Sequence, residues 1–233
     1  MKIIINERQL RQIIESKKNI KAYKIMVDEL GLKNASEQLG IPVNKLIEMG
    51  AVEKIDADIN LINTPINTLG AVKKAMINLN FGGHRNPMED LGELEYVKGY
   101  LDLSFNTKIK SLNNLKKVDG YLDLEGSSIE TLSGLTSVKL FLNLTDCENL
   151  TSLGNLNKVG RNLNLINAPI TSLDNLKYVG STLRLINCKN LTSLGKLEYV
   201  GGYLSLKGTP LAETMTKEEI ADKLKMDEKN IYI

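Results

Sequence analysis

A Leu-x-Leu pattern, in which two leucines flank one variable residue, recurs at nearly constant intervals along the chain. The first leucines of successive pairs are 21, 20, 21, 20 and 21 residues apart, namely Leu101, Leu122, Leu142, Leu163, Leu183 and Leu204. A period of this length is typical of solenoids, in which short coils of similar sequence stack on one another. The pattern therefore predicts a solenoid rather than a compact globular fold.

Within each coil, the spacing of the apolar residues predicts a short strand followed by turns. Two leucines at a spacing of two residues face inward in a strand, so the residue between them and the residue before them face outward. In the coil that starts at Leu101, apolar residues then come every third position, at Ile109, Leu112, Leu115 and Val118. This spacing suits a tight 3₁₀-like or extended turn better than an α-helix. Stacked coils are expected to form a parallel sheet over ladders of buried leucines.

Weaker copies of the pattern extend the solenoid toward the N-terminus. Ile59-Asn-Leu61 and Ile77-Asn-Leu79 each start a coil, so residues 55–211 are expected to form about eight coils. The second of these coils contains an insertion, residues 81–87 (Phe-Gly-Gly-His-Arg-Asn-Pro), which holds the only histidine. Insertions in solenoids lie in surface loops that often bind partners, so His84 and Arg85 are candidate binding residues. A surface insertion without a function is the alternative.

The first 54 residues lack the repeat and are predicted to form helices. Asn6 is a suitable N-cap for the first helix, and Gly31 ends the second. Two further helices meet at the turn Gly40-Ile-Pro42.

Two interpretations of residues 1–54 follow. The favoured one is a helical cap that covers the open end of the solenoid, which stacked repeats need for solubility. The alternative is a DNA-binding helix-turn-helix over residues 34–46. Against it, Lys45 is the only basic residue in this segment, whereas a helix that reads DNA normally presents several.

The repeat also ends before the C-terminus, and residues 212–233 are predicted to close that end. Thr216 is a suitable N-cap for an amphipathic helix, and Glu219 completes a capping box with it. The last three residues, Ile-Tyr-Ile, are expected to add one more extended strand.

Composition indicates a folded protein without an obvious affinity for nucleic acid. The 233 residues are 42% hydrophobic and 25% charged, and the net charge is only +2. The N-terminus lacks the apolar region of a signal peptide, and no apolar run approaches the length of a membrane span. We therefore expect a cytoplasmic protein without membrane contact, in a bacterial cell or a virus-infected host.

The two cysteines are expected to be buried free thiols. Cys147 and Cys188 each follow the second leucine of their pair by three residues, and they lie two coils apart. Stacked strands are about 4.8 Å apart, which separates the two residues by about 10 Å, beyond the reach of a disulfide. Other coils hold small residues at this position, as a tight inward corner requires.

Outward-facing residues of the Leu-x-Leu strands form the candidate binding surface. The candidates are Tyr100, Asp102, Tyr121, Asp123, Phe141, Asn143, Asn162, Asn164, Arg184 and Tyr203. Aromatic residues make up 5% of the chain, yet three of them form one column of this surface. Exposed tyrosines are typical interface anchors, and the aspartates favour a basic partner at that end. The alternative is that these aromatic and asparagine ladders only stabilise the stack.

The repeat unit carries a family likeness. The pattern Leu115-x-x-Val-x-Gly-Tyr-Leu-x-Leu124, followed by Ile129 and Leu132, resembles the leucine-rich repeats of receptor L-domain-like proteins and of short bacterial and phage solenoids. The likeness covers about residues 55–211, and the opening residues are similar to the starts of many tailed-phage proteins. With the predicted helices, it implies an α/β solenoid: a right-handed leucine-rich repeat stack with a parallel β-sheet, a helical N-terminal domain and a C-terminal capping helix. It also implies a sheet used for protein recognition, without a catalytic motif.

Three classes of function remain at this point. A non-enzymatic scaffold that binds a protein partner accounts for the repeats, the caps and the aromatic column. A DNA-binding regulator would use the N-terminal helices for reading and the solenoid as a sensor or oligomerisation module, so nucleic acid and a homo-oligomer stay open as partners. An enzyme is disfavoured, since the sequence has no phosphate-binding glycine loop, no nucleophile with its base, and no clustered metal ligands. We expect no cofactor and no metal.

Overall fold

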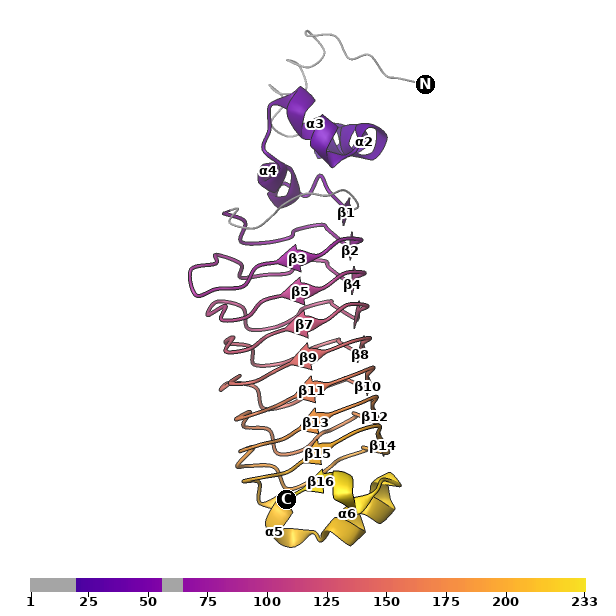
Figure 1. The fold of residues 1–233 in the computed structure, drawn as a ribbon. Helices are drawn as coiled ribbons and strands as arrows, with labels where there is room; N and C mark the ends of the chain where they lie inside the picture. The colour runs from indigo at the N-terminus through magenta and orange to yellow at the C-terminus, as the bar shows by residue number, and fades with distance from the viewer. Residues whose placement is uncertain (1–19, 56–64) are drawn as a thin grey trace.

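The structure, a computed structural model, describes residues 20–55 and 65–233 and is a parallel β-solenoid of about seven turns (Figure 1). Helices cover its N-terminal end and a short helix lies at its C-terminal end. The predicted repeat of about 21 residues and the scarcity of helix within the coils are confirmed, whereas the expected number of about eight coils is corrected to about seven turns. The predicted N-cap Asn6 and the coil start Ile59-Asn-Leu61 lie outside the described residues.

Each full turn contributes two very short strands to two parallel sheets. The first sheet is built from strands that end in valine, isoleucine or alanine, and we call it the valine sheet: β1 (Lys54–Ile55), β2 (Lys74–Ala75), β4 (Tyr96–Val97), β6 (Lys117–Val118), β8 (Ser137–Val138), β10 (Lys158–Val159), β12 (Tyr178–Val179) and β14 (Tyr199–Val200). The second begins each strand with leucine or isoleucine, and we call it the leucine sheet: β3 (Leu79–Asn80), β5 (Leu101–Asp102), β7 (Leu122–Asp123), β9 (Leu142–Asn143), β11 (Leu163–Asn164), β13 (Leu183–Arg184), β15 (Leu204–Ser205) and β16 (Ile231–Tyr232).

The sequence predicted only the leucine sheet, and the valine sheet is therefore a correction. The segment expected to be a turn is extended at its end, where Val97 pairs in register with Val118 of the next coil. A β-branched side chain favours this extended backbone, and its inward direction removes it from water. Both valines are fully buried.

The core is one continuous column of apolar side chains. The paired leucines, from Leu101 and Leu103 through Leu204 and Leu206, are all fully buried, as the period of two predicted. Cys147 and Cys188 are free and buried, which is also as predicted. Each thiol donates to a main-chain oxygen of the preceding coil, over 3.0 Å to Leu124 and 2.8 Å to Leu165. Both sulfurs therefore have a structural partner within the stack.

Besides its two strands, each coil contains a tight turn, and a column of short polar side chains closes these turns. In seven successive coils, the side-chain oxygen of a Ser, Thr or Asp accepts a hydrogen bond of 2.7–3.0 Å from the backbone N–H two residues later: Thr68, Asp90, Ser111, Thr131, Ser152, Ser172 and Ser193. The residue that donates has a left-handed backbone in each case, with φ between 47° and 58°. Each turn is thus closed by its own local hydrogen bond, as in Asx and ST turns.

The N-terminal helices pack onto the first coils. Helices α2 (Ile20–Leu30), α3 (Leu32–Leu39) and α4 (Val43–Glu48) follow one another, and Gly40 ends α3 with a left-handed φ of 63°. The Lys24 ammonium pairs with the Glu53 carboxylate, and the buried residues of these helices belong to the same core as the coils. The predicted helices and their glycine boundaries are confirmed within the described residues.

The C-terminal end is closed by α5 (Leu211–Thr214), α6 (Lys217–Leu224), the 3₁₀ helix η1 (Glu228–Asn230) and β16. Thr216 and Glu219 form the predicted capping box, and β16 adds the predicted last strand beside β15. Among the helices of residues 20–55 and 65–233, none combines the length and the apolar character that a membrane crossing requires.

Candidate interaction surface

The outward side of the leucine sheet carries the residues that the sequence selected. Neighbouring strands pair in register, so that Asp102 lies opposite Asp123 and Leu101 lies opposite Leu122. Equivalent residues of successive coils therefore form straight columns at a spacing of about 4.8 Å. In Figure 1 the strands β3 to β16 of this sheet face the viewer.

Two tyrosines at the N-terminal end of the sheet stack on each other. The rings of Tyr100 and Tyr121 are 4.6 Å apart and inclined by only 7°, and Tyr121 is 36% exposed. The third predicted member of this column, Phe141, is half-buried and makes no ring contact with another described residue. At the other end, Tyr203 is 53% exposed, and its ring lies 5.9 Å from that of Tyr232. The aromatic column is thus a stacked pair plus separate rings.

Asp102 and Asp123 lie beside the stacked pair, and Glu125 lies near Asp123. The Oδ1 atom of Asp102 accepts hydrogen bonds from the backbone N–H of Ser104 over 2.9 Å and from its hydroxyl over 2.7 Å, and Asp123 accepts from the backbone N–H of Glu125 over 3.1 Å. Burial raises the pKa of Asp123, and the neighbouring Asp102 and Glu125 charges add to this effect. Charged carboxylates here repel one another, so a basic group placed against them would relieve the repulsion.

Asn143 is a correction, because its side chain is not available to a partner. The residue is only 6% exposed; its Nδ2 donates to Oε2 of Glu125 over 2.9 Å, and its Oδ1 accepts from the backbone N–H of Thr145 over 3.3 Å. Asn162 also serves the stack, since it accepts the backbone N–H of Thr182 in the next coil over 3.2 Å. These hydrogen bonds support the alternative that the asparagine ladder only stabilises the stack of coils.

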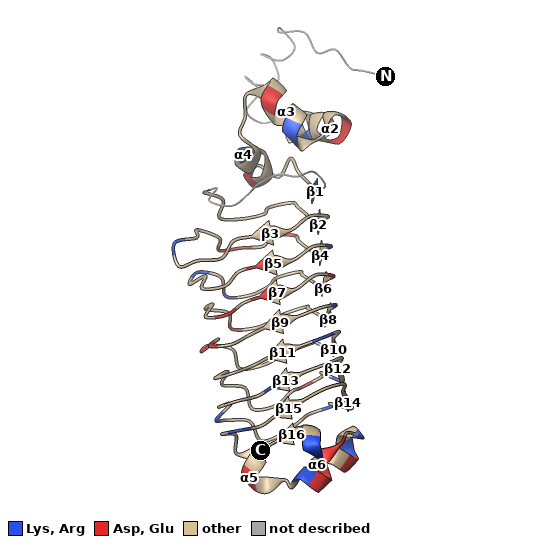
Figure 2. Ribbon diagram, viewed as in Figure 1, with Lys and Arg blue, Asp and Glu red and all other residues tan. Residues whose placement is uncertain are grey.

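The charge of the surface changes sign along the solenoid. Arg184 is exposed and donates to Oδ1 of Asn164 over 3.0 Å, which occupies the partly buried amide and orients the guanidinium. Lys207 is exposed one coil further on. In Figure 2 the acidic residues of this sheet lie on β5 and β7, and basic residues lie toward β13 and β15. The acidic residues of this face therefore lie in its N-terminal half.

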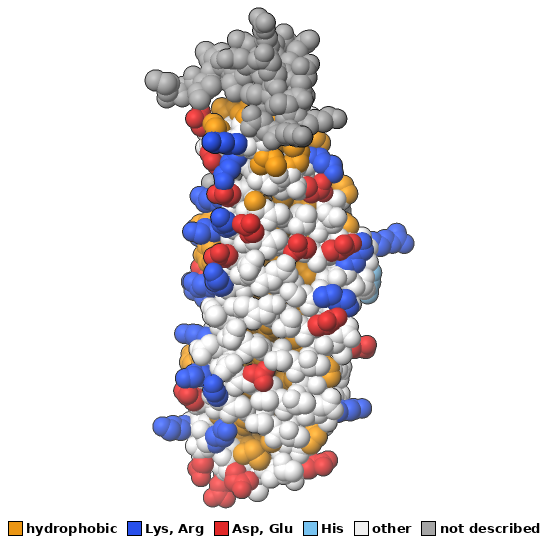
Figure 3. Space-filling model, turned by 180° about the vertical axis from the view of Figure 1, so that it is seen from behind, with side chains coloured by type: hydrophobic (Ala, Val, Ile, Leu, Met, Phe, Trp, Pro, Cys, Tyr) orange, Lys and Arg blue, Asp and Glu red, His pale blue; other side chains and the backbone are white. Residues whose placement is uncertain are grey.

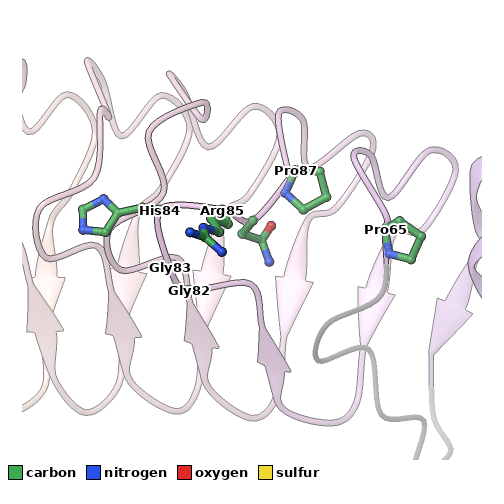
Figure 4. Close-up of a pocket in the computed structure, with 7 residues that line it drawn as sticks. Pro65, Gly82, Gly83, His84, Arg85 and Pro87 are labelled. Atoms are coloured by element: carbon green, nitrogen blue, oxygen red, sulfur yellow. The ribbon is translucent and has the colours of Figure 1, made fainter.

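The insertion forms a projecting loop at the acidic end of the leucine sheet. Residues 82–87 line an open cavity of about 630 Å³ together with Pro65, as Figure 4 shows. His84 and Arg85 are both exposed, and the His84 ring lies 5.4 Å from that of Phe105. The loop follows the next coil closely, since the backbone N–H of Gly83 donates to the Ser104 carbonyl oxygen over 2.6 Å. The structure thus brings the two predicted loop residues near the acidic end of the sheet.

Phe105 was not selected from the sequence, although it lies beside this loop. It is 40% exposed and has a left-handed backbone with φ 54°. Other coils place Gly126, Asp146 or Asn167 at this position, residues that tolerate such a backbone better than phenylalanine does. The comparison of equivalent positions between coils could have identified it. An exposed aromatic residue kept in an unfavourable conformation indicates a role outside the core.

The valine sheet carries a second aromatic stack that the sequence analysis also missed. Tyr178 and Tyr199 lie 4.9 Å apart with an inclination of 9°. Stacked aromatic residues therefore occur on both sheets, and not on the leucine sheet alone. The signal was the residue before each valine, which is often lysine or tyrosine.

Among the residues that the structure describes, no group of three His, Cys, Asp or Glu side chains is arranged to hold a metal ion. Comparison of the chain with models of protein families, with curated proteins and with solved structures gives no match.

Proposed function

We propose that this protein is a non-enzymatic scaffold that binds a protein partner through the outward face of the leucine sheet. The observation that carries the proposal is the stack of half-buried Tyr100 on exposed Tyr121, beside the carboxylates of Asp102 and Asp123. The finer assignment as a right-handed leucine-rich repeat protein of bacterial or phage origin is part of the same proposal and is supported by the Leu-x-Leu period.

The stacked pair has the properties of an interface anchor. Each ring is held by its neighbour at 4.6 Å, so that little side-chain freedom remains to be lost when a partner covers it. A tyrosine also offers a large apolar face together with a hydroxyl, which suits a surface that is wet before binding. Covering these rings could therefore contribute a large share of the binding free energy.

The carboxylates define the chemistry of the partner. Asp102, Asp123 and Glu125 lie within two adjacent coils, and the raised pKa of Asp123 reflects the cost of keeping its charge at this partly buried position. Arginine or lysine side chains of a partner would pair with these groups, and arginine could in addition lie flat on the tyrosine rings. We therefore expect a partner with a basic segment. His84 and Arg85 lie on the loop at the acidic end of the sheet, so they would border the site occupied by that segment.

The N-terminal helices lend no comparable support to the DNA-binding alternative. Lys45, the only basic residue of α4, pairs with Glu48 over 2.6 Å, which reduces the positive charge that a DNA phosphate would meet. Fluorescence anisotropy with labelled duplex DNA at low salt would test this alternative directly.

The proposal is tested by affinity capture with the full chain as bait, from lysate of a bacterial host, followed by measurement of affinity for the purified partner. The test variant is Tyr100→Ala/Tyr121→Ala/Phe141→Ala, which removes the column on the leucine sheet. The matched control is Tyr178→Ala/Tyr199→Ala, which removes an equally stacked pair from the valine sheet. Circular dichroism establishes that both variants fold.

A partner that binds the wild type and the control, but not the test variant, would support the proposal. Asp102→Asn/Asp123→Asn should then weaken the same partner, more strongly at low salt, since charge attraction is screened by added ions. A partner retained by the test variant would contradict the proposal, because the tyrosine stack would then serve only to hold the coils together.

A further inference from the structure

The outward column of the valine sheet has a gap at one coil. The residues at the outward position of its strands are Lys54, Lys74, Tyr96, Lys117, Ser137, Lys158, Tyr178 and Tyr199. All except Ser137 carry a long side chain. Since register places them in one column at a spacing of about 4.8 Å, a short serine between two lysines leaves a notch in the surface.

The lysines on both sides of Ser137 lean away from it. The Lys117 ammonium lies 5.7 Å from the centre of the Tyr96 ring, and the Lys158 ammonium lies 4.8 Å from that of Tyr178. Each lysine therefore rests on the tyrosine beyond it, as a cation–π pair, and leaves the space above the serine open. This open space is a cavity of about 380 Å³.

One side of the notch is formed by the residues that directly follow the valines of this sheet, and this side is shallow at one coil. Gly160 lies there, and a Cβ atom on it would overlap the carbonyl oxygen of Lys139 in the preceding coil. Only glycine fits this position, because the two backbones approach too closely for any side chain. The notch is thus bordered by the stems of Lys117, Lys139 and Lys158 and has no side chain at Gly160.

The notch has an excess of positive charge. Asp119 is its only acidic residue, and it already accepts a hydrogen bond from the Tyr96 hydroxyl over 2.6 Å and pairs with Lys117 over 2.9 Å. These two partners lower the pKa of Asp119, so it stays charged. Neither Lys139 nor Lys158 forms an ion pair within the described part of the chain. Figure 3 shows basic side chains, with acidic ones among them, along the left edge of that view.

We propose that the notch over Ser137, between Lys117, Lys139 and Lys158, is a binding site for the phosphate group of a small phosphorylated ligand. The three lysines and the one carboxylate leave two positive charges around the notch, which matches a phosphate dianion better than a single carboxylate. To reach the phosphate, the ammonium groups of Lys117 and Lys158 would turn from their tyrosines toward the notch. The Ser137 hydroxyl at the floor can donate a hydrogen bond to a phosphate oxygen. This site lies on the other sheet from the proposed protein-binding surface and is independent of it.

The test uses inorganic pyrophosphate as the probe and the full chain, with binding measured by isothermal titration calorimetry and by amide shifts of the isotope-labelled protein. The wild type should bind saturably, with the largest shifts at Ser137 and Lys139. In Lys139→Gln/Lys158→Gln the affinity should fall by about tenfold or more, because charge-assisted bonds to the phosphate are lost. In Ser137→Tyr the net charge is unchanged but the floor is filled, and binding should be lost.

Lys98→Gln is the matched control, because it removes one exposed lysine from the column of Lys139, two coils away. Its affinity should stay within about twofold of the wild type, since at two coils, about 10 Å or one Debye length, its charge is partly screened and it makes no direct contact with the phosphate. The proposal is overturned if pyrophosphate does not bind, if Ser137→Tyr binds as the wild type does, or if Lys98→Gln loses as much as the double variant. Binding of a single-stranded oligonucleotide that Ser137→Tyr leaves unchanged, in place of pyrophosphate binding, would likewise overturn it and indicate a diffuse basic surface.

Discussion

Replacing Asn106 with leucine should destabilise the protein strongly, although the residue lies in no proposed site. Asn106 is fully buried at the inward corner where other coils hold small residues. Its Nδ2 donates to the Met88 carbonyl oxygen over 3.1 Å, and its Oδ1 accepts the backbone N–H groups of Lys108 over 2.8 Å and Ile109 over 3.0 Å. Met88 directly follows the inserted loop, so this amide holds the base of the loop to the next coil.

The magnitude follows from the groups that would lose their partner. In Asn106→Leu the carbonyl of Met88 and the N–H of Ile109 stay buried without a hydrogen bond, whereas exposed Lys108 can turn to water. Each of these two buried unpaired groups costs about 1–3 kcal/mol, which predicts a loss of about 2–6 kcal/mol in the free energy of unfolding. The matched control is Ser127→Ala at the same corner of the next coil, where the hydroxyl only contacts the Cys147 sulfur at 3.9 Å. We expect less than about 1 kcal/mol there.

Urea unfolding followed by far-UV circular dichroism measures both variants. Because stacked coils can unfold in parts, amide hydrogen exchange at Ile109 gives a local measure of the same loss. If Asn106→Leu unfolds at the same urea concentration as Ser127→Ala, and Ile109 stays equally protected, the assignment of stability to this buried amide is wrong.

Three further predictions concern the thiols, the acidic group and the close backbone contacts. Burial raises the pKa of Cys147 and Cys188 to about 12, so both should resist a thiol reagent at pH 8 in the native protein and react at once in urea, as absorbance of the released chromophore would report. Burial also raises the pKa of Asp123, so the folded protein prefers its neutral form and loses stability as the pH rises and the group ionises. Asp123→Asn should therefore melt at a higher temperature than the wild type at pH 7, and the difference should vanish below the ordinary aspartate pKa of about 3.9; an equal difference at both pH values would contradict this cause. Gly160→Ala should cost about 1–3 kcal/mol or more through backbone overlap, while Gly134→Ala, whose Cβ would meet its nearest atoms at 3.8 Å, should be nearly neutral in the same melts.

The leucine sheet could be predicted from the sequence because burial alone sets its pattern. Leu122 and Leu124 point to the same side of their strand, so both leave water when that side faces the core. Because such pairs recur at one period, the coils can stack in only one register. The valine sheet could not be predicted in the same way. Its strands are two residues long with one inward residue each, such as Val118 after Lys117, so they contain no alternation to detect.

The candidate surface was predictable in position but not in detail. An asparagine between two leucines has the same local sequence whether it faces solvent or bonds to a neighbouring coil, and only the structure shows that Asn143 bonds to Glu125. Asn106 was missed for a related reason. It is a large polar residue at a corner that elsewhere holds small ones, and its partner Met88 lies on the far side of an insertion whose path the sequence does not determine.

Because of the column of serine, threonine and aspartate turns, the length of the solenoid is set by the number of its coils. Each corner is closed by a hydrogen bond that spans two residues, such as Ser152 to the N–H of Gly154, so a coil depends on its own sequence and on its immediate neighbours only. Gene duplication or loss of whole coils would thus lengthen or shorten both sheets in steps of about 4.8 Å without disturbing the ends. Selection could then adjust the distance between the tyrosine stack and the basic end to the size of a partner, without inventing a new fold.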